Sequence, residues 1–120
     1  MPIVVLDGSA QGIKAFHLVA AGTTNLTLLK KGEGRVHGWY IYNAAAAARK
    51  VNLHDGALVP VAGIGVWIPL VLPAGSAANV FSDKGIPFGA GLGISTVTDL
   101  TDAGTTAVTA SDLVLTIFYA

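Results

Sequence analysis

The polar residues that normally solvate exposed helix faces are almost missing from this chain. Its 120 residues include one glutamate, Glu33, and one glutamine, Gln11, although long polar helix formers usually cover the outward side of a helix. Short runs of β-branched and aromatic residues recur instead, separated by clusters of glycine, proline, asparagine and aspartate. Short apolar runs separated by turn-forming residues are typical of a β-sandwich or β-barrel. We therefore predict an all-β, single-domain antiparallel β-sandwich, jelly-roll-like, with about eight strands.

Side-chain alternation locates these strands, because successive residues of a strand point to opposite faces. Val51 and Leu53 face one way, while Lys50, Asn52 and His54 face the other. The predicted strands are Ile13–Val19, Leu26–Lys30, Arg35–Asn43, Arg49–Asp55, Val66–Leu72, Ala78–Ser82, Leu92–Thr98 and Leu113–Tyr119, with Ile86–Phe88 as a further short piece.

Turn residues divide the predicted strands. Glycines in the segment 31–34 predict a tight connection, and the segment 83–85 predicts a similar break. Pro69 cannot donate a ladder hydrogen bond, so its strand is predicted to lie at a sheet edge or to carry a bulge. The alanine run 44–48 is too short to persist as a helix, and we expect a hairpin loop with at most one helical turn.

The predicted sandwich domain covers residues 13–120, and residues 1–12 form a predicted flexible arm with an apolar tip. This arm either adds a strand to the sheet of a neighbour or is a disordered leader. No signal peptide is visible at the amino end, and no stretch of about 20 apolar residues could span a bilayer. The chain contains no cysteine, which excludes disulfides and thiol nucleophiles.

Charge is scarce and balanced. Seven basic and seven acidic side chains give a formal net charge of zero, and charged residues make up 12% of the chain, against about 25% in typical proteins. We expect no nucleic-acid and no membrane partner, because electrostatic binding to nucleic acid or to an anionic membrane requires an excess of basic side chains. An apolar surface with so little charge is poorly protected against association. We therefore expect partner subunits to cover part of it.

No catalytic, cofactor or metal site is predicted. His54 and Asp55 are adjacent in a strand and face opposite sides, while His17 and His37 supply two metal ligands without a third. The five serines lie outside nucleophile elbows and the aspartates lie in turns. We therefore predict no nucleophile–base pair and do not expect a small hydrolase. The glycine-rich segment 89–93 precedes a strand rather than a helix, which indicates a bend and not a phosphate loop.

The best candidates for a binding patch are aromatic. Trp39 and Tyr40 alternate, so we expect one in the core and the other free to act as an interface anchor or a sugar-stacking platform. The candidate interface residues are Trp39, Tyr40, Tyr42, Trp67, Phe118 and Tyr119.

The strand and turn patterns over most of residues 13–120 resemble those of small virion proteins of tailed bacteriophages. The segments that carry the resemblance are Arg35–Asn43, the alanine-rich turn, Arg49–Asp55, Ile68-Pro69-Leu70, Pro73-Ala74-Gly75, Gly85-Ile86-Pro87-Phe88, Gly93-Ile94-Ser95 and Phe118-Tyr119.

This resemblance implies a β-sandwich or jelly-roll subunit that decorates or cements a capsid, and it carries over no functional residues. The implied partners are the chain itself, as a dimer or trimer, and the major capsid protein. The implied location is the virion, after synthesis in the host cytoplasm. A receptor- or carbohydrate-binding module of a head or tail fibre is the alternative.

Overall fold

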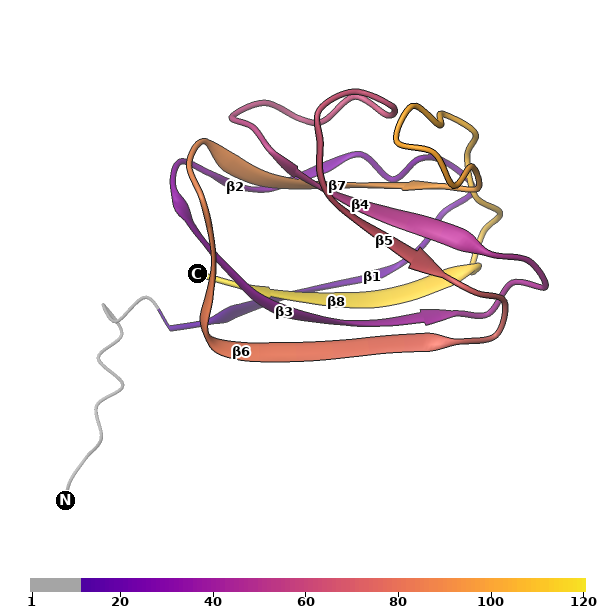
Figure 1. Ribbon diagram of the computed structural model, residues 1–120, viewed down its shortest axis with the longest axis horizontal. Coiled ribbons are helices and arrows are strands. Elements are labelled where there is room, and N and C mark those ends of the chain that lie inside the picture. The colour runs from indigo at the N-terminus through magenta and orange to yellow at the C-terminus, as the bar shows by residue number, and fades with distance from the viewer. Residues whose placement is uncertain (1–11) are drawn as a thin grey trace, which may run out of the picture.

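The computed structural model describes residues 12–120, which form eight strands and no helix (Figure 1). These residues therefore contain no helix that could cross a membrane. The predicted arm over residues 1–12 lies, apart from Gly12, outside the described residues. The strands are β1 Lys14–Val19, β2 Thr27–Lys31, β3 Gly34–Asn43, β4 Arg49–Asp55, β5 Val66–Leu72, β6 Ala77–Phe88, β7 Gly91–Val97 and β8 Leu113–Tyr119.

The strands form two antiparallel four-stranded sheets, ordered β1-β8-β3-β6 and β2-β7-β4-β5. The first strand pairs with the last, β2 with β7, β3 with β6 and β4 with β5. The chain is thus one long antiparallel hairpin that has been rolled up, and the contacts β8–β3 and β7–β4 complete the two sheets. Eight strands in this order form a jelly roll, which confirms the predicted fold class.

The core lies between the sheets and is built from alternate strand residues. Val51 and Leu53 of β4 belong to the same core cluster as Leu115 and Ile117 of β8, and all four are fully buried. Each such side chain contributes about 1.5–3 kcal/mol when it leaves water. The alternation that was used to place the strands is therefore the alternation that builds the core.

One predicted break is wrong. The segment 83–85 lies inside β6, which joins the two predicted pieces Ala78–Ser82 and Ile86–Phe88 into one strand. The pairing of β6 with β3 shifts register here, and Gly85 absorbs the irregularity at φ +72° while its N–H donates to the Ser82 hydroxyl. A bulge bends a strand without ending it.

The tight connection and the edge strand are confirmed. The segment 31–34 joins β2 to β3 with Gly32 at φ +94°, and β5, which carries Pro69, lies at the edge of its sheet. In both cases the local chemistry of glycine or proline decides the backbone. The alanine run 44–48 is a loop without a helical turn, but it is not the predicted hairpin loop, because β3 and β4 lie in different sheets and the loop crosses between them.

Two loops cover the outer side of the β2-β7-β4-β5 sheet over β7 and β4, while Pro69 and Val71 on the edge strand β5 stay exposed. In Figure 1 the β4–β5 loop and the β7–β8 loop both lie above this sheet, away from the other one. A Cβ on Gly93 of β7 would come within 2.3 Å of the Pro60 ring, and one on Gly63 within 2.7 Å of the Ala103 carbonyl oxygen. The first loop therefore packs on the sheet and against the second loop.

Candidate interaction surface

No loop within residues 12–120 covers the outward side of the β1-β8-β3-β6 sheet. Strand register places its side chains in three rows of four. The rows are Ala15, Phe118, Gly38 and Phe81; His17, Thr116, Tyr40 and Asn79; and Val19, Val114, Tyr42 and Ala77. None of these residues is charged, and we call the three rows the uncharged face.

Large side chains on the uncharged face remain half exposed. Tyr40 is 50% exposed, Tyr42 47% and Phe81 49%. Phe118 is packed by two edge-to-face contacts, with ring centroids 5.0 Å from Tyr40 and 5.8 Å from Phe81. Contiguous apolar surface of this kind marks an interaction site more often than scattered apolar residues do. This face is therefore a candidate interaction site, and its rigid sheet distinguishes it from the β4–β5 loop, where Leu58, Val61 and Ile64 are also exposed.

A shallow depression of about 240 Å³ lies on this face between the two tyrosines. Asn79 and Thr116 contribute an amide and a hydroxyl to its lining. His17 lies beside it, with Nδ1 2.9 Å from the Thr116 Oγ1 atom. The face thus combines aromatic rings with a few uncharged hydrogen-bonding groups.

Three of the six candidate interface residues lie on the uncharged face. They are Tyr40, Tyr42 and Phe118. The expectation that Trp39 and Tyr40 separate is confirmed, because Trp39 is 8% exposed and belongs to the core.

The remaining candidates lie elsewhere. Trp67 and Tyr119 pack against the core, and the Trp67 ring lies 6.3 Å from that of Phe88. Trp39, Trp67 and Tyr119 therefore do not join the face, because their side chains point to the inner side of their strands. Phe81 was missed by the sequence interpretation, since only its pairing opposite Gly38 reveals that it faces outward beside Phe118.

The histidines do not gather. His17 bonds Thr116 on one side of β8, while His37 Nδ1 lies 2.9 Å from the Ser82 carbonyl oxygen and its ring stacks on Phe81. Within residues 12–120 no three histidine, aspartate or glutamate side chains come together as a metal site would require. Each of these imidazoles instead has a local hydrogen-bond partner.

One serine–histidine pair does exist, contrary to the sequence interpretation. His54 Nε2 lies 2.8 Å from Ser95 Oγ, and His54 Nδ1 lies 3.1 Å from the Gly65 carbonyl oxygen. Because a carbonyl only accepts, Nδ1 carries the proton and the Ser95 hydroxyl donates to Nε2. Both side chains are buried, His54 at 4% and Ser95 at 0% exposure. The pair ties β4 and β7 to the β4–β5 loop, and burial lowers the pKa of His54.

Two aspartates organise turns, as predicted. The Asp55 carboxylate accepts hydrogen bonds from the N–H groups of Gly89 and Ala90, which lower its pKa. The Asp99 carboxylate accepts the N–H groups of Thr105 and Thr106, with the same effect on its pKa. The carboxylate oxygens of both aspartates therefore accept hydrogen bonds from backbone N–H groups of the protein itself.

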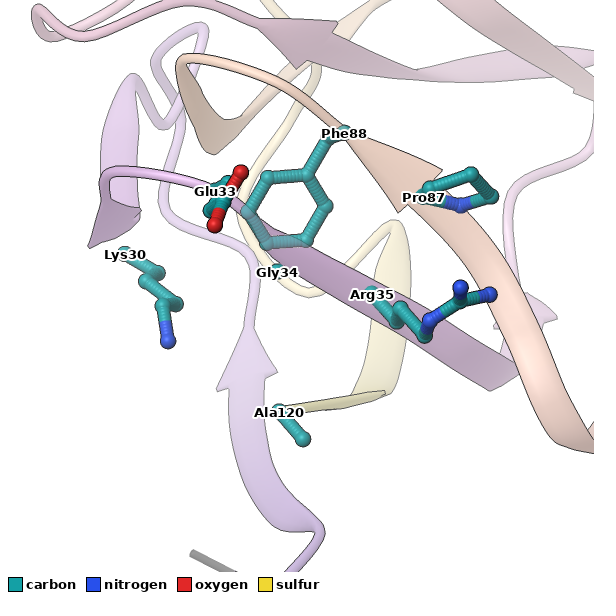
Figure 2. Close-up of a pocket in the computed structure, with 7 residues that line it drawn as sticks. All are labelled: Lys30, Glu33, Gly34, Arg35, Pro87, Phe88 and Ala120. Atoms are coloured by element: carbon teal, nitrogen blue, oxygen red, sulfur yellow. The ribbon is translucent and has the colours of Figure 1, made fainter.

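A second depression, of about 450 Å³, opens at one end of the sandwich (Figure 2). Lys30 and Arg35 lie on either side of it, and Glu33 and Phe88 also contribute to its lining. The Arg35 guanidinium donates to the Lys84 carbonyl at 3.1 Å. These groups differ in sign and do not converge on one point, so they form no defined binding site.

No protein-family model, no curated protein and no solved structure matches this chain.

Proposed function

We propose that this chain is a structural protein of a virus particle, which decorates or cements a bacteriophage capsid as an oligomer of β-sandwich subunits. The observation that carries the proposal is the uncharged face: half-exposed aromatic side chains stand on a rigid sheet that none of the described loops covers. The resemblance of the strand and turn patterns to small phage virion proteins supplies the viral context.

Burial on such a face is favourable because no ionised group has to leave water. Apolar contact is worth about 25 cal/mol for each Å² removed from water, whereas a buried unpaired charge costs several kcal/mol. A cement protein acts by adding buried area between neighbouring subunits of a shell. The described part of the chain offers this kind of area on one sheet, while its own loops already cover the outside of the other.

The test uses capsids that lack the protein. Purified chain is mixed with such capsids at increasing ratios, and the bound copies are counted by sedimentation and light scattering. Saturation at a fixed number of copies for each capsid supports the proposal. A chain that stays in the supernatant at every ratio contradicts it.

A receptor- or carbohydrate-binding module is the second candidate, and the depression between the tyrosines favours it. Tyr40 and Tyr42 offer ring faces to a sugar, and Asn79 and Thr116 offer hydrogen bonds. Titration with a panel of glycans, followed by NMR of the tyrosine rings, separates the two functions. Saturable shifts that disappear in Tyr42→Ala would favour the module over the capsid protein.

A further inference from the structure

We infer that the uncharged face is a homodimer interface, on which a second copy of this chain packs face to face about a two-fold axis parallel to the strands. The axis runs between β8 and β3, the two central strands of the sheet. The inference rests on the oligomer of the proposed function: it names a second copy as the partner that buries this face, which leaves capsid contacts to the rest of the dimer, and it holds in the absence of any capsid.

Electrostatics selects a second copy as the occupant. A partner that placed a charged group on this face would bury it against residues that cannot pair it, which is costly. Charged side chains border the face only at its ends: Arg35 lies beyond the first row on β3, and Asp112 lies just before β8, paired with Arg49 at 2.8 Å. The matching surface must therefore be uncharged over the three rows, and a second copy offers such a surface.

The shape of the face also suits its own copy. Rotation about the proposed axis places β8 of one copy over β3 of the other and keeps the three rows aligned. Thr116 then faces Tyr40 of the second copy, and Val114 faces Tyr42, so a small side chain meets a large one in both rows. His17 on β1 faces Asn79 on β6, which brings two polar groups together.

The perpendicular two-fold axis in the same plane gives a poorer fit. It would place Tyr40 directly on Tyr40 of the second copy, and each half-exposed ring would compete for the same space. Both axes keep the strands of the two sheets aligned, as packed sheets require, so the side chains of the middle row decide between them.

The size of the face indicates a concentration-dependent dimer. Four strands about 4.8 Å apart and three rows about 6.8 Å apart cover a projected area of about 400 Å². Side-chain relief raises the accessible area above this value, and a stable interface buries about 800 Å² on each partner. The projected area of the face is therefore about half of what a stable interface buries on each partner, and dilution should dissociate the dimer.

Sedimentation velocity over a range of concentrations tests the interface. Asn79→Lys places a charge in the middle row at an exposed position, and Leu58→Lys places the same charge on the β4–β5 loop, where Leu58 is 79% exposed. We expect the natural chain and Leu58→Lys to dimerise, and Asn79→Lys to dissociate more than about tenfold more readily, because each new ammonium would be buried opposite His17 of the second copy without an acidic partner. A monomeric natural chain, or a dimer that Asn79→Lys leaves unchanged, overturns the inference.

Cross-linking tests the axis, since the chain has no cysteine of its own. His17 and Asn79 lie on opposite edge strands, three strand spacings or about 14 Å apart. With a short bismaleimide, a mixture of the His17→Cys and Asn79→Cys variants should cross-link, because the axis brings these positions face to face at about the 10 Å separation of packed sheets. Each variant alone should not. Cross-linking of a single variant to itself, or none in the mixture, overturns the proposed axis.

These results are independent of capsid binding. A monomer that saturates capsids refutes the homodimer and leaves the proposed function standing. A dimer of the predicted geometry that ignores capsids supports the homodimer and refutes the cement role.

Discussion

Asn52 provides the most direct test of how the outer side of the β2-β7-β4-β5 sheet is closed. Its side chain points outward from β4, between Pro69 of β5 and Ser95 of β7 in register, yet it is fully buried. Within residues 12–120 neither its Nδ2 nor its Oδ1 atom has a hydrogen-bond partner. Mutational data place the cost of burying such an amide at about 1–3 kcal/mol.

Replacing Asn52 with leucine removes this cost and keeps a side chain of similar size. We expect Asn52→Leu to raise the free energy of unfolding by about 1–3 kcal/mol, because burying a leucine side chain is favourable whereas burying the unpaired amide is costly. Each kcal/mol should raise the Tm by about 3–6 °C in a domain of this size. Urea unfolding followed by tryptophan fluorescence and a thermal scan measure both quantities.

Asn43 is the matched control, since it is equally buried but fully bonded. Its Nδ2 donates to the carbonyls of Ala47, Leu72 and Pro73, and its Oδ1 accepts the Ala45 N–H. Asn43→Leu should therefore lower the free energy of unfolding by about 2–4 kcal/mol. Opposite signs for the two variants support the reasoning. A loss of stability in Asn52→Leu comparable to that in Asn43→Leu would refute it.

Three further predictions concern the same closed side. Asp102→Ala leaves the ammonium of Lys50, whose side chain is 1% exposed, without its ion-pair partner. Urea unfolding should show a free energy of unfolding lower by about 1–3 kcal/mol. An unchanged value would mean that water reaches Lys50. The new methyl group in Gly93→Ala must displace the Pro60 ring, so the free energy of unfolding should fall by about 1–3 kcal/mol. Hydrogen exchange in the β4–β5 loop should become faster. Unchanged exchange would contradict the contact between Gly93 and Pro60. Burial lowers the pKa of His54 below 6.5, so the folded state binds fewer protons than the unfolded state, and the free energy of unfolding should fall as the pH drops below about 6.5. His54→Gln should flatten this slope between pH 7 and 5, and an unchanged slope would assign it to other groups.

The strands were predictable because their signal is local. Alternation within β4 and β8 depends on neighbouring residues alone, and the predicted bounds Arg49–Asp55 and Leu113–Tyr119 are those of the structure. The break at 83–85 was not predictable in the same way, because a turn and a bulge use the same residue types. Only the pairing of β6 with β3 on both sides of Gly85 keeps the strand continuous.

The candidate surface was predictable in part. The sequence indicates that Trp39 and Tyr40 separate, but it does not say which of them enters the core. That choice depends on β8 and β6, whose residues Phe118 and Phe81 arrive from distant parts of the chain and surround Gly38 on the outward side. The uncharged character of the face is a property of four strands together, and no single strand displays it.

By itself the sequence determined an all-β chain of eight strands, the edge position of the strand with Pro69 and the lack of charge, because each follows from local chemistry or from composition. The tertiary structure decided which sheet the two described loops cover on its outer side and which sheet they leave uncovered. Alternation gives every strand two sides, and in β4 the polar side, with Lys50 and His54, is buried as deeply as the apolar one. The two loops that cover it come from different parts of the chain, so their effect appears only when the strands they connect are folded against each other.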